Sequence, residues 1–407
     1  MAIGLMAIIS PSDIGIFLLD MFVISGIVFL SLENALLFFV VSLPFFAIVP
    51  GISDSFSIWR ILVAILALRT AWTERRQLAV YLRSLLSRNF VQEIKSLSWL
   101  NRSLILFFGF ALISALNAKY FTVALKQIFF WGNIIVFGYL AYHYVKTRTD
   151  LHKILFAFII SVGEILAVGM FQLYLGSVWP LFNFWQFWAQ NIIPIFYGEK
   201  LAFLLSYSNT WFSYFTDAPA MLRIFSVFPD SHSYSLYLVL GMVFIGFMVF
   251  DSMKLNKKHW LKIGLLSMSL MGVIISGSRG VWVGILVPAI AFFGLYFFKK
   301  GDRKVPLFML SLVLTFILIF PIASLLASLT QKYDAPSDIE SQNLMFRRMF
   351  SVTDTNEESN KGRLEIWKET LFFIKDSPLL GIGPGNFPLV LNEDISNAKK
   401  GASAHNL

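Results

Sequence analysis

Two arginines beside apolar segments are the side chains with the clearest chemical potential in this chain. Arg279 stands in the short sequence Ser276–Gly280 between two apolar blocks, and Arg223 stands shortly before another block. An arginine inside a bilayer costs at least about 2.5 kcal/mol, so it usually has a partner. Guanidinium groups bind phosphate oxygens through two parallel hydrogen bonds, and two of them close together need an anion between them. The pair therefore predicts a diphosphate site, and the alternative for Arg279 is an anchor at the membrane interface.

Proton transfer has two candidates, His405 and Glu164. His405 lies in a polar segment, and the ordinary histidine pKa of about 6.5 suits a general base. The alternative is that His405 is an ordinary polar residue with no role in catalysis. Glu164 is a carboxylate well inside an apolar block, and an acid inside the membrane is a functional candidate by default. It can be a proton site, a partner of Lys126 or a residue near a helix end, and the sequence leaves these three roles open.

The elements that must position these residues are membrane spans. Hydrophobic residues make up 57% of the 407 positions and charged residues 14%, whereas a soluble domain has roughly 25% charged residues. The apolar residues come in ten blocks, most of them near the roughly 20 residues that a spanning helix needs. The blocks are Ile14–Leu30, Ala35–Val49, Phe56–Trp72, Ser103–Leu116, Val123–Tyr144, Ile154–Leu175, Ser233–Phe250, Leu261–Ile275, Val281–Phe298 and Val305–Ser328. The predicted fold is therefore all-α, a polytopic transmembrane helix bundle of about ten spans.

Other functions are excluded or disfavoured by composition and charge. The chain has no cysteine, which excludes disulfides, thiol nucleophiles and cysteine zinc sites. Four connecting segments carry a net positive charge, and basic connections lie on the cytoplasmic side. They are Glu74–Arg102, Lys146–Lys153, Asp251–Lys262 and Lys299–Lys304. The net charge of +9 thus reflects topology, and we expect no nucleic acid partner. Because successive connections alternate between the two sides of the membrane, the basic ones also place the N-terminus outside. This holds unless Ile14–Leu30, which contains Asp20, is interfacial.

Two segments on the expected outer side are too long to be simple connections. Residues 176–232 are rich in Trp, Phe and Tyr, which indicates an interfacial aromatic belt or a half-inserted loop that holds a lipid tail or sugar rings. Residues 329–407 are polar, with a helical stretch at Arg363–Lys375 before a glycine-rich turn. Long loops of this kind usually carry function. We expect a transmembrane bundle over residues 1–328 and a large, partly helical extracytoplasmic loop over residues 329–407.

Four sequence motifs occur in the order found in a known family. They are Arg223–Asp230, Ser276–Gly280, the stretch Gly362–Trp367 together with Asp376–Phe387, and finally His405 with Asn406. They resemble the arginine segment, the core signature, the large outer loop and the histidine-plus-amide motif of the bacterial O-antigen ligase and polymerase family. The ordered set, which covers about Arg223 to Leu407, is fairly specific, whereas each motif alone is weak. Earlier residues match only in hydropathy.

The resemblance implies a metal-independent glycosyltransferase of the bacterial inner membrane, with its active face outside the cytoplasm and no cofactor. Such enzymes move a glycan from an undecaprenyl diphosphate carrier in the bilayer to an acceptor hydroxyl of lipid A–core, a glycan or a protein, in surface polysaccharide or lipopolysaccharide biosynthesis. Arg223 and Arg279 would bind the diphosphate, Arg363 would assist there or order the loop, and His405 would act on the acceptor hydroxyl. Family members continue into further spans, so we expect this sequence to stop short of the complete bundle.

A transporter or flippase for a lipid-linked saccharide is the alternative function. It predicts broken helices and polar sites near the middle of the membrane. Glu164 and Lys126 give that alternative modest support. The long outer loop with its histidine and arginines favours the transferase.

Overall fold

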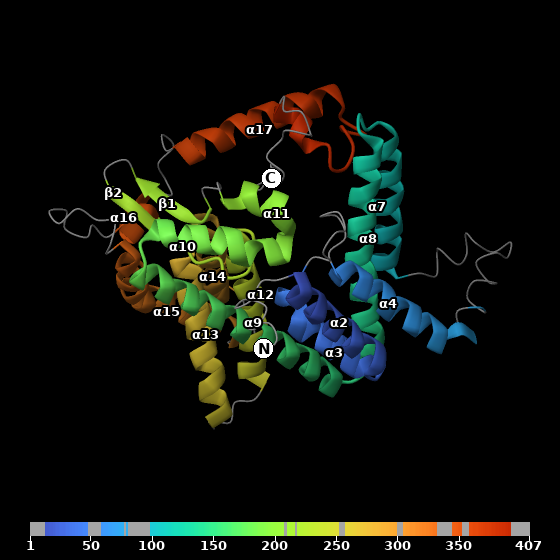
Figure 1. Cartoon of the computed structure of the whole chain (residues 1–407), viewed down its shortest axis with the longest axis horizontal. Coiled ribbons are helices and arrows are strands. Elements are labelled where there is room, and N and C mark those ends of the chain that lie inside the picture. The colour runs from blue at the N-terminus through green and yellow to red at the C-terminus, as the bar shows by residue number, and fades with distance from the viewer. Residues whose placement is uncertain are drawn as a thin grey trace. The chain divides into compact units, whose positions relative to one another are not determined.

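The computed structural model describes most of the chain in a mainly helical fold (Figure 1). The described residues are 13–47, 58–76, 79, 98–206, 210–215, 218–251, 257–298, 304–331, 344–351 and 358–391. His405, the predicted general base, lies outside these residues. The all-α prediction is right for nearly all of the described chain, and the one departure is a short β-hairpin.

Each of the ten apolar blocks contains a helix, because a chain in lipid must satisfy its backbone polar groups internally. The helices are α2 (Asp13–Phe29), α3 (Leu32–Ser42), α4 (Ile58–Thr73), α7 (Trp99–Leu116), α8 (Phe121–Tyr144), α9 (Arg148–Val178), α12 (Ser231–Asp251), α13 (Lys257–Ile275), α14 (Arg279–Phe298) and α15 (Lys304–Ser328). In the described part of the chain, five helices are long and apolar enough to cross a membrane, namely α7, α8, α9, α12 and α15. The total of about ten spans stays a prediction.

The chain divides into two compact units. The first consists of Met1–Trp59 and Val145–Thr353, and the second of Arg60–Tyr144 and Asp354–Leu407. This division follows packing, so it is a different description from the expected boundary between residues 328 and 329, which separates parts by their side of the membrane. The boundary at residue 328 stays a prediction.

The core of the first unit lies between α9, α12, α13 and α15. Its inward side chains include Val162, Leu238 and Ile274, all fully buried. Gly241 of α12 allows α9 to approach closely, because a Cβ at that position would lie 2.5 Å from Cγ2 of Val162. Small residues permit such close packing between helices in lipid, where apolar burial supplies little. These helices form a tightly packed frame around the connection between α13 and α14.

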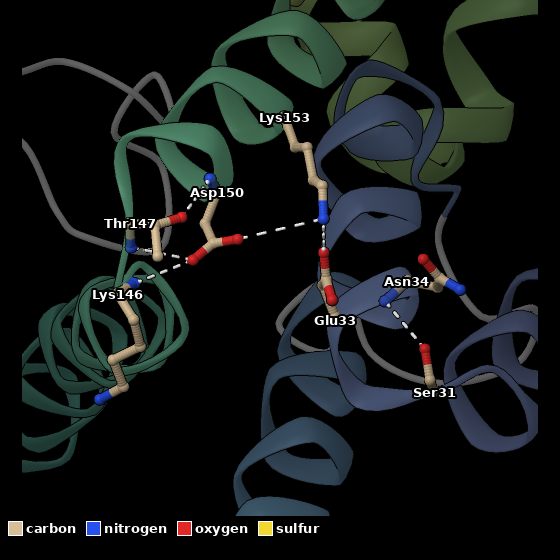
Figure 2. A network of polar contacts seen from close by, with 7 residues as sticks. All are labelled: Ser31, Glu33, Asn34, Lys146, Thr147, Asp150 and Lys153. Carbon is tan, nitrogen blue, oxygen red and sulfur yellow. Dashed lines mark hydrogen bonds and ion pairs between the residues drawn. The ribbon is translucent and has the colours of Figure 1, made fainter.

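The beginnings of α3 and α9 are joined at one end of the first unit (Figure 2). The Thr147 hydroxyl accepts the backbone N–H of Asp150, and the Asp150 carboxylate accepts the backbone N–H of Thr147, which caps the start of α9. Lys153 Nζ then donates to Glu33 Oε1 over 2.5 Å. The ion pair joins the connection before α3 to the connection before α9. The charge pattern predicts both connections on the cytoplasmic side of the membrane.

The aromatic segment of residues 176–232 is a folded layer with a buried aromatic core. It contains α10 (Leu181–Phe187), a π-helix η2 (Trp188–Ile192), α11 (Ile193–Ser206) and the antiparallel strands β1 (Phe212–Phe215) and β2 (Ala218–Leu222). Phe184, Trp188, Trp211 and Phe225 are fully buried in one core. The rings of Trp211 and Phe225 stack at 4.5 Å between centroids. These four rings fill protein space, so they neither face lipid nor offer a surface for sugar rings.

Short elements complete the two units. In the first unit, η1 (Leu43–Phe45) follows α3, η3 (Leu329–Gln331) continues α15, and α16 (Leu344–Phe350) packs against α15 through Phe320 and Phe346, whose ring centroids lie 4.9 Å apart. In the second unit, α7 and α8 form a hairpin, and α17 (Glu358–Asp376) is followed by a glycine-rich turn and η5 (Phe387–Leu391). The predicted helical stretch at Arg363–Lys375 is confirmed by α17.

Candidate functional site

The centre of the candidate site is the tight connection between α13 and α14. Helix α13 ends at Ile275 and α14 begins at Arg279, so the chain reverses within three residues. Gly277 makes this possible with a φ of 63°, a left-handed backbone conformation that glycine adopts without a steric cost. Ser276 and Ser278 on either side are fully buried. The turn therefore presents its backbone carbonyls to groups packed closely around it.

Arg223 lies directly against this turn. It follows β2 in an extended segment, and its side chain is only 2% exposed. Its Nε donates to the carbonyl oxygen of Ser276 over 2.9 Å, and its Nη2 donates to Oγ of Ser278 over 3.4 Å. The backbone N–H of Arg223 bonds to the carbonyl of Trp211 over 2.9 Å. The aromatic core therefore fixes the backbone of Arg223, and the turn fixes its guanidinium.

A buried glutamine holds the segment that follows Arg223. Gln172, in the middle of the core-facing side of α9, accepts the backbone N–H groups of Phe225 and Ser226 with Oε1, each over 2.9 Å. Ser226 has a φ of 55°, which is uncommon for a residue other than glycine. Its hydroxyl donates to the carbonyl of Ile165 over 3.0 Å. These bonds offset the strained backbone, because both N–H groups and the hydroxyl at the sharp bend of Ser226 have partners.

Arg279 is held by a segment that sequence reasoning did not include. Nη1 of Arg279 donates to Oγ of Ser351 over 2.6 Å and to its carbonyl over 3.2 Å. Arg348, three residues earlier, donates from Nε to the carbonyl of Gly277 over 2.8 Å. Helix α16, which carries Arg348, is anchored by Leu344 and Met345, both at most 2% exposed. A third arginine therefore reaches the turn from a different part of the chain.

Buried serines join the start of α12 to the same turn. The hydroxyls of Ser235 and Ser276 are 2.7 Å apart, and Ser278 Oγ donates to the carbonyl of Ser231 over 3.1 Å. All four serines are fully buried. The hydroxyl of Ser231 has no hydrogen-bond partner among the described residues, and the same holds for the side-chain nitrogen of Gln172. Two buried polar groups therefore remain for a group that the described chain does not supply.

An acidic residue caps the start of α12 beside this site. Asp230 Oδ1 accepts the backbone N–H of Ser233 over 2.7 Å, and Oδ2 accepts its hydroxyl over 2.9 Å. Burial raises the pKa of the Tyr197 hydroxyl, and the Asp230 carboxylate raises this pKa further. Tyr197 therefore stays protonated and neutral near the start of α12.

The site concentrates positive charge in a poorly hydrated place. The hydrogen bonds described above orient Arg223, Arg279 and Arg348 through carbonyl and hydroxyl oxygens, which are neutral acceptors. Preorganised guanidinium groups at low dielectric stabilise an anion more strongly than they would in water. The arrangement is therefore chemically suited to a phosphate or diphosphate group.

Glu164 occupies a separate position in the first unit. It lies in α9, two helical turns before Gln172 and thus about 12 Å from it along the axis. Its Oε2 is buried and has no hydrogen-bond partner in the described part of the chain. One turn earlier, the hydroxyls of Ser161 and Tyr237 bond to each other. Glu164 is therefore far from a helix end, and its pairing with Lys126, which belongs to the second unit, stays a prediction.

The structure brings together two of the predicted site residues, Arg223 and Arg279, at the turn between α13 and α14. Arg363 lies in α17 of the second unit, so its role at the diphosphate stays a prediction. Arg348 escaped sequence analysis because it sits beside Arg347 in a polar segment with many charges. One available signal was its position two residues after an apolar pair, Met345 and Phe346, that the structure packs into the core.

The fold and this site define a helical membrane protein in which two buried arginines, Arg223 and Arg279, and the partly buried Arg348 meet at one turn. Residues 263–407 match the sequence profile of the family described as O-antigen ligase. The match supports an assignment of this part of the chain to the O-antigen ligase and polymerase family. The family indicates ligase- or polymerase-type glycosyl transfer in surface polysaccharide biosynthesis. The match includes Arg279, Arg348, Arg363 and His405, while Arg223 precedes it. No curated protein and no solved structure shows significant similarity to the chain.

Proposed function

We propose that this protein transfers a glycan from undecaprenyl diphosphate to an acceptor hydroxyl at the outer face of the bacterial inner membrane, without a metal ion or cofactor. One observation carries the proposal: Arg223 meets the turn of Arg279 although 55 residues separate Arg223 from Ser278. The family match supports glycosyl transfer. The arginine cluster supports a donor whose leaving group is an anion.

The chemistry follows from where charge develops. The acceptor hydroxyl oxygen attacks the anomeric carbon of the glycan while the bond from that carbon to the phosphate oxygen breaks. The departing undecaprenyl diphosphate takes the electron pair, and its growing negative charge lies against Arg223 and Arg279. Removal of one fixed donor from such a site typically costs about 10²–10³ in rate. His405 accepts the proton of the hydroxyl, and a general base contributes typically about 10²–10⁴-fold.

Three further groups fit the same anion. Arg348 adds a third guanidinium at the carbonyl of Gly277. The hydroxyl of Ser231 and the amide nitrogen of Gln172 are buried donors without an acceptor in the described chain. A buried donor left without a partner costs about 1–3 kcal/mol, so a ligand that accepts from it gains that stabilisation. The proposed occupants of the site are the oxygens of the diphosphate.

A ligase and a polymerase share this donor chemistry and differ in the acceptor. The acceptor is lipid A–core or a protein for a ligase and a second glycan for a polymerase. Arg363 assists at the diphosphate or orders the large loop in either case.

A lipid-linked saccharide transporter or flippase is the second candidate, and Glu164 favours it, because its Oε2 is buried and has no hydrogen-bond partner among the described residues. An acid inside an apolar helix is a typical feature of a proton pathway. The two candidates assign the essential role to different residues. They are therefore separable by mutation.

The test is complementation of a deletion of the full gene in the native host, read as a gel of surface glycans. Arg279→Ala and His405→Ala are expected to lose the glycan ladder at normal membrane abundance, whereas Glu164→Gln restores it. Polymer left on the lipid carrier identifies a ligase, and single capped units identify a polymerase. The reverse pattern, with Glu164→Gln inactive and Arg279→Ala active, would overturn the transferase in favour of transport. Arg347→Ala, an exposed arginine on α16, is the matched control.

A further inference from the structure

Helix α17 carries an exposed apolar row along one side. Leu364, Leu371 and Ile374 are 50%, 66% and 53% exposed. Positions seven and three residues apart lie on the same side of a helix. Just beyond the helix, Leu379 is 89% exposed. Single exposed apolar residues are ordinary on a protein surface, but a contiguous row marks an interaction site.

A row of lysines runs beside the apolar row. Lys361, Lys368 and Lys375 recur every seven residues, and all three are exposed. On a helix of 3.6 residues per turn, each lysine lies within about 60° of Leu364 or Leu371. The exposed acidic residues Glu365, Glu369 and Asp376 lie on the far side of the lysine row. Around α17, the order is therefore apolar, basic and acidic.

The side of α17 that adjoins the apolar row at Ile374 faces its own unit. Thr370 is 8% exposed and donates its hydroxyl to the carbonyl of Ile366 over 2.7 Å. Helix α17 packs against η5 within the second unit. The apolar row is thus a second surface and not the side that attaches the helix to its own unit.

The turn after α17 clamps the helix to the connection between α7 and α8. Ser114 Oγ donates to the carbonyl of Leu380 over 2.6 Å, and Asn117 Nδ2 donates to the carbonyl of Gly381 over 2.8 Å. Asn386 is fully buried, and its Oδ1 accepts the backbone N–H of Tyr120 over 3.0 Å. The C-terminal end of α17 is thereby fixed at the end of the α7–α8 hairpin.

This attachment places α17 at the boundary between membrane and water. Helices α7 and α8 are both long and apolar enough to cross a membrane, so the turn between them lies at one surface of the bilayer. Figure 1 shows α17 running crosswise to the α7–α8 pair. A helix crosswise to two spanning helices, at their end, lies along the plane of the membrane.

The apolar surface of α7 continues up to the clamp. Leu112, Ile113 and Leu116 are 49%, 50% and 76% exposed, and Leu116 directly precedes the clamped Asn117. Exposed apolar side chains on a spanning helix face acyl chains. Lipid therefore reaches the level at which α17 is attached.

We propose that α17 lies flat on the bilayer surface at the α7–α8 turn, which the charge pattern predicts to be the outer surface. The row of Leu364, Leu371 and Ile374 enters the acyl boundary, and the lysine row binds lipid phosphates. A helix with an apolar side and flanking lysines binds a membrane surface by apolar burial and by attraction to anionic lipids. The occupant of this surface is the lipid leaflet, and the inference is independent of the proposed glycan transfer.

The absence of cysteine in the sequence makes the test direct. Single cysteines replace Leu364, Leu371 or Ile374 in the full chain and carry a nitroxide spin label, with Glu365→Cys and Glu369→Cys as controls on the acidic row. The labelled proteins are placed in nanodiscs of phosphatidylethanolamine and phosphatidylglycerol. Accessibility to oxygen, which concentrates in lipid, is compared with accessibility to a water-soluble nickel complex.

Labels on the apolar row are expected to favour oxygen over nickel by several-fold, and labels on the acidic row the reverse. Equal nickel accessibility at Leu371→Cys and Glu369→Cys would overturn the proposal, because the row would face water. Exclusion of both reagents at Leu371→Cys would also overturn it, because protein would then cover the row. The experiment uses no glycan donor, so neither result depends on the proposed transferase.

A second comparison isolates the lysines. Gln replaces Lys361, Lys368 and Lys375 together in the Leu371→Cys protein. The oxygen preference at position 371 is expected to fall in anionic nanodiscs and to stay unchanged in neutral phosphatidylcholine nanodiscs. An equal fall in both lipids would remove the phosphate contact from the proposal.

Discussion

The turn between α13 and α14 and the turn after α17 are built with the same backbone device and use it differently. Gly277 has a φ of 63° in the first turn, and Gly383 has a φ of 86° in the second. The carbonyl of Gly277 receives a guanidinium, from Arg348. The second turn is fixed by neutral amides, above all Asn386. Three arginines meet at the first turn, whereas the bonds described at the second turn are made by neutral groups.

This difference separates a binding site from an anchor. Guanidinium groups that meet at one turn attract an anion such as a phosphate group. Neutral donors and acceptors that satisfy one another gain stability and leave nothing for a ligand. Variants at the first turn should therefore change donor binding, and variants at the second turn should change stability.

Removal of the third arginine should give the largest effect in this comparison. Arg348→Ala loses a charge-assisted hydrogen bond to the carbonyl of Gly277, a bond worth about 1.5–3 kcal/mol. Affinity for undecaprenyl diphosphate should fall at least about tenfold. The measurement is binding of that lipid to the purified protein in nanodiscs. Arg347→Ala removes the same charge from an exposed neighbour and should leave affinity unchanged. Equal losses in both variants would show a general effect of charge, with no special role for Arg348.

The two arginines of the first turn could be predicted from the sequence, because charged residues are rare in and beside the apolar blocks. Arg223 and Arg279 stand next to apolar blocks, where an arginine requires an explanation. Arg348 stands among other charged residues, so its burial depends on how α16 packs against α15. The ten helices were predictable for the same reason as the arginines, since a bilayer restricts the backbone to few solutions.

The aromatic layer shows what composition leaves open. A segment rich in Trp and Phe has the same composition as a surface belt, a ligand cradle or a packed core. The stacking of Trp211 on Phe225, and the bond from Trp211 Nε1 to the carbonyl of Pro229 over 2.9 Å, show that these residues belong to a packed core. These are contacts between residues distant in sequence, which periodicity does not encode. The clamp of Asn386 on Tyr120 was hidden for the same reason.

Loss of the anchor should reduce stability and leave donor binding intact. Asn386→Ala removes the acceptor of the Tyr120 N–H and the donor to the carbonyls of Tyr120 and Pro384, inside a fully buried site. Unsatisfied buried groups cost about 1–3 kcal/mol. The melting temperature in nanodiscs should fall by several degrees. Asn101→Ala, at an exposed position of α7, is the control. If Asn386→Ala instead abolished donor binding at unchanged stability, the two turns would not be functionally distinct.

The smallest effects should come from charges that lie in water, and the network of Figure 2 allows this to be measured. The side chains of Glu33 and Lys153 are 50% and 46% exposed, so Glu33→Gln should change the free energy of unfolding by about 0–1 kcal/mol. Thr147→Ala removes the cap of α9, a loss of typically about 1 kcal/mol. Chemical denaturation of both variants tests the order. Greater destabilisation by Glu33→Gln would mean that this end of the bundle is less hydrated than its exposure indicates, and that its charges, like those at the first turn, act at low dielectric.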